Sequence, residues 1–160
     1  MACTRQGAEE WPSLLDGGQS LRRALQVKPS VRRTFVITSD DVLPMLSEAC
    51  PSFREALAAS LRENGEELLY AHAGALADHL LERHKAGDEQ TLARAGAFIE
   101  RLHVEGDPYV HNLATIGFLE GIQNVWAGAL AAEEFKPYLG PVSTKAWEDL
   151  NDFWDEVDRK

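Results

Sequence analysis

The chain has 160 residues, a mass of 17.7 kDa and a formal net charge of −10, and 44% of its residues are apolar. This length is typical of one domain with its own core, and two cysteines, Cys3 and Cys50, are too few for a disulfide framework or a cysteine-rich zinc module. No apolar run is long enough for a membrane helix, and the acidic balance argues against general nucleic-acid binding.

Charge is divided unevenly along the chain. Residues 1–38 hold six basic and three acidic side chains, for +3, whereas residues 39–160 hold ten basic and twenty-three acidic ones, for −13. Because the first part contains Gly17-Gly18 and Pro29 and little helical periodicity, we expect residues 1–38 to form a basic, loosely structured arm and residues 39–160 an acidic helical domain. The β-branched run at residues 33–38 favours a short extended segment. The first residues lack the pattern of a secretory signal, so we expect a cytoplasmic protein.

From Ser39 onward the sequence contains the start and stop signals of a series of short helices. Ser39 is a candidate N-cap, Pro51 suits the first position of a helix, and Asp107-Pro108 combines a capping carboxylate with proline at the first helical position. Because short links between consecutive helices favour antiparallel packing, we expect an all-α, compact bundle of six to seven antiparallel helices. Solenoid-like pairing of the middle helices is an alternative arrangement. The expected helices cover residues 39–50, 51–64, 66–85, 88–104, 107–122, 123–135 and 144–157.

The helix expected at residues 107–122 is apolar around most of its circumference, which is typical of a central, buried helix. Gly96 and Gly117 would let neighbouring helices approach closely. Glu120 lies within about 20° of Leu113 when each residue turns the helix by about 100°. We therefore expect Glu120 to project from an apolar face, either as a structural carboxylate held by a partner or as an acid that lines a pocket.

The sequence offers little support for catalysis or metal binding. His72 and His79 lie seven residues apart, about 10 Å along a helix, which is too far for one metal ion. The Glu-x-x-His element that ends at His103 occurs once, whereas di-iron bundles use two. Cys50 ends a helix, where the dipole raises a thiol pKa. We therefore assign no catalytic residue, cofactor or metal ligand.

The last helix carries the clearest surface feature. Leu150, Phe153 and Val157 form an apolar stripe, and acidic side chains occupy the opposite side. Like charges four residues apart do not stabilise a helix, so this side is either an ordinary solvated face or an edge that binds another protein. The residues that would bind a partner are Trp147, Glu148, Asp149, Asp152, Trp154, Asp155 and Glu156.

Several short motifs between residues 43 and 154 carry a resemblance. They include Cys50-Pro51-Ser52-Phe53, Gly117-Phe118-Leu119-Glu120 and Tyr138-Leu139-Gly140-Pro141. In these motifs the chain resembles a family of small, acidic, all-helical bacterial proteins of unknown function, similar in style to the immunity proteins encoded beside bacterial toxins. The resemblance implies a toxin-like protein partner and brings no catalytic residues.

Two functions follow as hypotheses. The first is an immunity-type antidote that binds and occludes a basic toxin through an acidic surface. The alternative is a small helical enzyme or ligand-binding domain with a pocket around Glu120 and at least one of His72, His79 and His103. A weaker third option is a regulator whose basic arm touches nucleic acid. The identity of the partner and the oligomeric state are left open.

Overall fold

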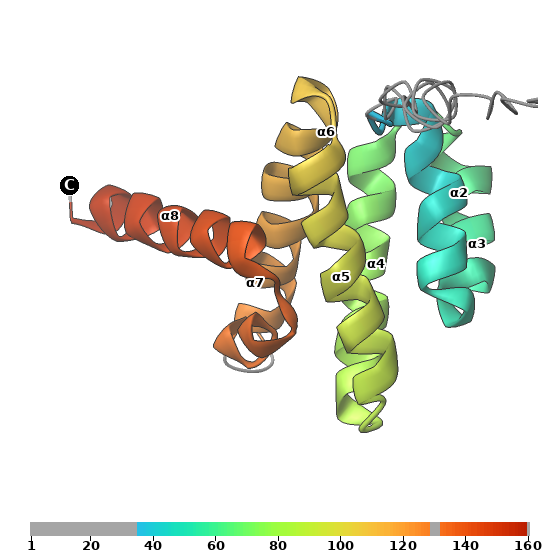
Figure 1. Ribbon diagram of the computed structural model, residues 1–160. Coiled ribbons are helices and arrows are strands. Elements are labelled where there is room, and N and C mark those ends of the chain that lie inside the picture. Colours follow the sequence, from blue (N-terminus) through green and yellow to red (C-terminus); the bar gives the residue numbers. More distant parts are fainter. Residues whose placement is uncertain (1–34, 129–131, 160) are drawn as a thin grey trace, which may run out of the picture. The chain divides into compact units, whose positions relative to one another are not determined.

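The computed structural model describes residues 35–128 and 132–159, so most of the expected N-terminal arm lies outside the described residues. Helices make up nearly all of this part, which confirms the all-α prediction (Figure 1). No helix within residues 35–128 and 132–159 is long and apolar enough to cross a bilayer. The seven α-helices of these residues are α2 (Ser39–Ala49), α3 (Arg54–Asn64), α4 (Leu69–Lys85), α5 (Glu89–Glu105), α6 (Pro108–Asn112), α7 (Glu120–Ala127) and α8 (Pro141–Asp158).

The first described residues join the body through Ile37. Its side chain is fully buried, and its backbone forms a single parallel bridge with Gly106. The Ile37 N–H donates to the carbonyl of Glu105, and the Asp107 N–H donates to the carbonyl of Ile37, both at 2.9 Å. Phe35 and Val36 are exposed, so the expected extended segment contributes one core residue.

The N-cap of α2 is Thr38 rather than Ser39. The Asp41 carboxylate accepts hydrogen bonds from the Thr38 backbone N–H at 2.9 Å and from its hydroxyl at 2.8 Å. This capping arrangement shifts the start of the helix by one residue from the sequence expectation. The two hydrogen bonds lower the pKa of Asp41.

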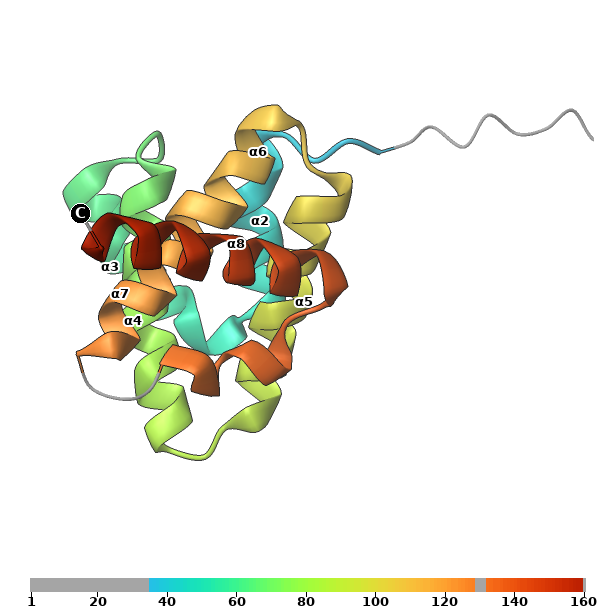
Figure 2. The same cartoon turned by 90° about the vertical axis from the view of Figure 1, so that its left-hand side faces the viewer.

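The long helices α4 and α5 form the centre of the bundle. α4 packs against α3, α5 and α7, and α5 packs against α2 and α8. α8 crosses the body, as the view in Figure 2 shows. The core between these helices is built from leucines with a few aromatic rings, and its largest fully buried side chains include Trp126, Trp147, Phe53, Phe118 and Phe135.

A π-helical segment, Leu113–Leu119, joins α6 to α7. Because its hydrogen bonds span five residues, each turn holds more residues than an α-helical turn. Leu113 and Glu120 are seven positions apart, which is nearly two complete turns of an α-helix but well short of two turns of the wider π-helix. Leu113 is buried, but Glu120 is rotated away from it and is partly exposed. The expectation of a buried Glu120 was wrong for this reason.

The helix expected at residues 123–135 is also not formed. Residues 123–127 complete α7, and the described residues after it form two short 3₁₀ turns, Ala132–Glu134 and Lys136–Tyr138. These turns return the chain to the body and place Phe135 in the core. Its ring centre lies 5.4 Å from that of Trp126 and 6.4 Å from that of Trp147.

Candidate functional site

The base of α8 is fixed to α5 by Glu100. The cap residue Gly140 has no side chain to bond the first N–H groups of α8, and the Glu100 carboxylate takes this role. It accepts hydrogen bonds from the backbone N–H groups of Val142 at 3.0 Å and Ser143 at 2.8 Å. Desolvation raises the pKa of Glu100, but the hydrogen bonds from Ser143 and Val142 outweigh it, and the pKa is lowered.

A buried histidine supports the same junction. His103 Nδ1 lies 2.9 Å from Ser143 Oγ and 3.1 Å from the carbonyl of Ile99, and Nε2 lies 3.0 Å from Thr115 Oγ1. Burial and, to a smaller extent, the neighbouring His111 together lower the pKa of His103 to about 4. His103 is therefore neutral at pH 7 and links α5, the π-helical segment and α8.

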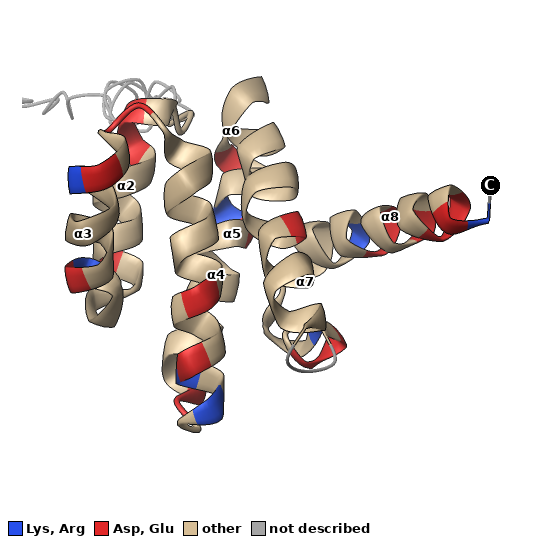
Figure 3. Ribbon diagram, turned by 180° about the vertical axis from the view of Figure 1, so that it is seen from behind, with Lys and Arg blue, Asp and Glu red and all other residues tan. Residues whose placement is uncertain are grey.

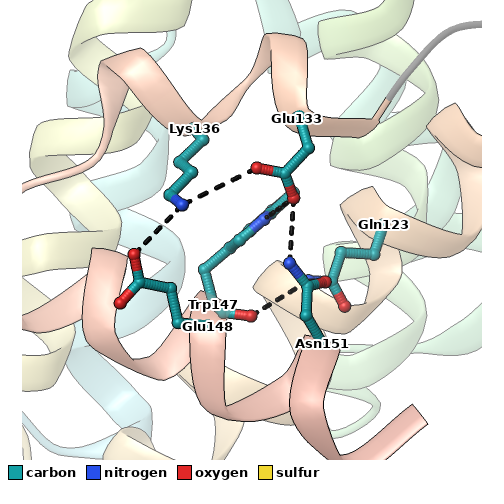
Figure 4. Close-up of polar contacts among 6 residues, drawn as sticks. All are labelled: Gln123, Glu133, Lys136, Trp147, Glu148 and Asn151. Atoms are coloured by element: carbon teal, nitrogen blue, oxygen red, sulfur yellow. Dashed lines mark hydrogen bonds and ion pairs between the residues drawn. The ribbon is translucent and has the colours of Figure 1, made fainter. Parts of the chain in front are cut away.

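The middle of α8 is anchored by Trp147, which is fully buried. Its indole N–H donates to Glu133 at 2.8 Å, and the Asn151 amide donates to the same carboxylate oxygen at 2.9 Å (Figure 4). Gln123 donates to Asn151 Oδ1 at 2.9 Å. The bond from Trp147 is the main cause of the lowered pKa of Glu133. Trp147 is thus a core residue, and its prediction as an exposed partner anchor was wrong.

The two acidic residues beside Trp147 each lie next to a lysine. Lys136 Nζ lies 3.0 Å from Glu148, and Lys145 Nζ lies 2.8 Å from Asp149. Lys136 is partly exposed and the other three side chains are exposed, so each pair contributes little to stability. They nevertheless reduce the negative potential of this part of α8, and Glu148 and Asp149 are weaker candidates for a partner contact than the acids that follow them.

The remaining turns of α8 form an exposed end. From Asp152 to Arg159 the described side chains are all exposed, and Figure 3 shows acidic residues along this end. Within residues 35–128 and 132–159, no ion pair involves its carboxylates. We call this end the distal α8 surface; its residues are Asp152, Phe153, Trp154, Asp155, Glu156 and Val157.

The distal α8 surface carries two of the three side chains of the predicted apolar stripe. Phe153 is 55% exposed and Val157 is 46% exposed, whereas Leu150 is only 7% exposed. The predicted apolar stripe is therefore buried only at Leu150, because α8 extends beyond the body on which its first half packs. Trp154 is 38% exposed, and its ring centre lies 5.2 Å from that of Phe153. Phe153 and Val157 are site residues that the helical pattern alone did not reveal.

The other candidates have structural roles. His72 is buried, with Nδ1 2.8 Å from Ser60 Oγ and Nε2 2.8 Å from the carbonyl of Gly65, so it closes the turn between α3 and α4. His79 lies 3.0 Å from Ser52 Oγ. Burial raises the pKa of Cys50 to about 11, which makes this thiol a poor nucleophile.

Neither of two surface hollows found on the described residues involves Glu120. The larger, about 700 Å³, lies between α2 and α3. The smaller, about 330 Å³, lies between α2 and α5 and includes Arg94 and Arg101. In the part of the chain that the structure describes, no group of three or more histidine, cysteine or acidic side chains is placed to hold a metal ion.

Comparison with protein families gives one match, which covers residues 43–155 and therefore more than half of the chain. The chain belongs to the family described as a domain of unknown function, DUF7674. This assignment confirms the predicted resemblance to a family of unknown function. The matched region of the DUF7674 domain begins within α2 and ends within the distal α8 surface. None of the curated proteins and none of the solved structures matches the chain.

Proposed function

We propose that this DUF7674 protein binds another protein, and that the distal α8 surface is the contact. One observation carries the proposal: Phe153, Trp154 and Val157 are exposed together on turns of α8 that bury no side chain. Large aromatic side chains that become buried on association are the usual anchors of protein interfaces. Exposed apolar groups on one helix end, surrounded by charge, are typical of an interaction site rather than of a solvated face.

The charges of this surface indicate that its partner is basic. Asp152, Asp155 and Glu156 flank the aromatic side chains, and the segment 39–160 carries −13 in total. Such a surface attracts a basic protein over a distance of about 8–10 Å at physiological salt and raises the association rate. We therefore expect the carboxylates to control how fast the partner arrives, and Phe153 and Trp154 to control how long it stays.

In its most specific form the proposal is an immunity-type antidote that occludes a basic toxin in the cytoplasm. This form is supported by the acidic surface and by the small size and all-helical style that the sequence shares with immunity proteins. The product of the neighbouring open reading frame is the first partner to test. Tagged full-length protein would be mixed with that product and with native lysate, and binding kinetics would be recorded by surface plasmon resonance.

The charge test uses a matched pair of variants. Asp152→Lys/Asp155→Lys/Glu156→Lys reverses the distal α8 surface and should slow association with the partner about tenfold or more and flatten its salt dependence. The control places three lysines elsewhere, at the exposed Glu55, Asp78 and Glu89, with the same change in net charge. Equal effects of both triple variants would contradict a local contact.

The anchor test measures dissociation. Trp154→Ala should raise the dissociation rate with little effect on association, since large losses are expected at aromatic anchors. The antidote form requires in addition that binding reduces the toxicity of the partner when both are co-expressed. A partner that binds through this surface while remaining fully toxic would refute the antidote and retain the binding role.

A further inference from the structure

The larger hollow is a groove with apolar walls. α2 packs mainly on α5, whereas α3 packs on α4, so the two helices rest on different supports. Leu43 and Pro44 of α2 form one wall, and Leu57 and Leu61 of α3 form the other. We call this hollow the α2–α3 groove. Figure 1 shows the two helices running in opposite directions.

The lining of the groove also includes Leu69 of α4 and Tyr109 of α6. The Tyr109 ring packs edge-on against that of Tyr70, with the ring centres 6.4 Å apart. Tyr109 is 43% exposed. A volume of about 700 Å³ is large enough for several aliphatic side chains, and it lies within the range of established ligand sites.

The two ends of the groove differ in charge. Asp40 at the start of α2 lies at one end, together with Glu66 and Glu67 from the turn between α3 and α4. Within residues 35–128 and 132–159, no lysine or arginine forms an ion pair with these three carboxylates. At the other end, Arg54 donates from Nε to the carbonyl of Ser47 at 3.0 Å. The groove therefore selects an occupant that is apolar along its length and positive at one end.

The length of the groove fits a helix. Along α2 it extends from Ser39 to Ser47, a helical rise of about 12 Å. Apolar side chains at positions i and i+7 of a second helix are about 10 Å apart along its axis and fit within this length, with the side chain at i+4 between them. Amphipathic helices that place such a row into an apolar groove are a recurrent mode of recognition.

We propose that the α2–α3 groove binds an amphipathic helix of a partner protein. Three apolar side chains of that helix enter the groove, and its lysine or arginine residues lie beside Asp40, Glu66 and Glu67. This site is separate from the distal α8 surface and does not depend on the function proposed for it.

A pair of synthetic peptides tests the proposal. One peptide of about 14 residues carries leucine at i, i+4 and i+7 and lysines at one end, and the other carries glutamates in place of the lysines. Both bear fluorescein, and binding to the full-length protein is measured by fluorescence anisotropy. The lysine peptide should bind saturably, and the glutamate peptide should bind about tenfold more weakly.

Two neutralised variants locate the contact. The variant Asp40→Asn/Glu66→Gln/Glu67→Gln should bind the lysine peptide about tenfold more weakly, and this binding should depend less on salt concentration. The control Asp152→Asn/Asp155→Asn/Glu156→Gln removes the same charge from the distal α8 surface and should leave peptide binding unchanged. Circular dichroism confirms that both variants are folded. Because the two variants change different surfaces, failure of one proposal does not imply failure of the other.

Several results would overturn the proposal. They are no saturable binding at about 1 mM peptide, equal affinity for the two peptides, and equal losses in the two neutralised variants. Binding of dodecyltrimethylammonium below its micelle concentration without binding of either peptide would indicate a small amphiphilic cation instead. Self-association that is lost in the groove variant would indicate a second copy of this chain.

Discussion

Two glycines within helices differ in what surrounds them. A Cβ at Gly96 would meet the backbone carbonyl of Tyr138, which crosses α5 at this point and cannot be displaced like a flexible side chain. We predict that Gly96→Ala lowers the free energy of unfolding by about 2 kcal/mol, because overpacking costs more than the gain in helix propensity. Urea denaturation followed by circular dichroism measures the change.

Gly74 in α4 is the matched control for this substitution. A Cβ there would have no neighbour within 4 Å. Gly74→Ala should therefore raise the free energy of unfolding by about 0.5–1 kcal/mol through helix propensity alone. A gain in stability for Gly96→Ala similar to that for Gly74→Ala would show that the crossing at Tyr138 is less tight than the structure indicates.

His103 makes stability depend on pH. Its pKa is lowered from 6.5 to about 4 in the folded state. Between these values the unfolded chain binds a proton that the folded chain does not, so stability falls as pH drops through this window. The loss amounts to roughly 3 kcal/mol at the lower end. Stability should not change further with this group above about pH 7.

The variant His103→Asn isolates this effect. Urea denaturation between pH 4.5 and 7.5 should show a shallower pH slope for the variant than for the natural chain. Burial also lowers the pKa of His79, but that group is present in both proteins and cancels in the comparison. An unchanged slope would mean that His103 accepts a proton without disturbing its contacts with Ser143 and Thr115.

At the scale of elements, α8 depends on a cap supplied by another helix. Glu100→Gln keeps an acceptor oxygen but removes the charge that interacts with the N-terminus of α8, so we expect a loss of about 1 kcal/mol. Hydrogen exchange should accelerate at the first amides of α8 and remain unchanged in α3. Glu63→Gln, at an exposed position of α3, is the control and should change neither quantity. A uniform acceleration in all helices would contradict a local role.

The two tryptophans of α8 show what a helical pattern can predict. Trp147 and Trp154 are seven residues apart and therefore lie on nearly the same side of the helix. One is fully buried and the other is 38% exposed. Periodicity identifies the side of a helix, but burial also depends on where the supporting body ends. That boundary is set by Phe135 and Glu133, which come from a segment that the sequence pattern assigned to a regular helix.

The π-helical segment limits prediction in a similar way. The expected position of Glu120 assumed an unbroken α-helix from residue 107 to residue 122. One wider segment, Leu113–Leu119, changes the direction of the side chains that follow it. Gly117 lies inside this segment, where a Cβ would come within 3.3 Å of Tyr70 and 3.4 Å of Ala73 in α4. The expectation of close helix approach at Gly117 is confirmed, although the helical register was not.

For the whole molecule, composition together with the start and stop signals of the helices was sufficient to predict the fold class. Pro51, Asp107-Pro108 and Gly140-Pro141 act locally on the backbone, so their effects are visible in the sequence. Contacts between distant segments were not predictable in this way. The capping of α8 by Glu100 and the α2–α3 groove both depend on which helix rests on which.

The molecule therefore divides into a packed body and an exposed end of α8, and this division can be tested. Removal of residues 152–160 should change the free energy of unfolding by less than about 0.5 kcal/mol, because the described part of this segment buries no side chain. The urea m-value should also stay constant, because the deleted residues are already exposed in the folded protein and add little to the surface that unfolding exposes. In contrast, Trp147→Ala should cost about 3–5 kcal/mol, because it removes a fully buried ring from the junction of α5, α7 and α8. A large loss of stability on truncation would show that the end of α8 packs against the body, and it would remove the basis for a binding surface there.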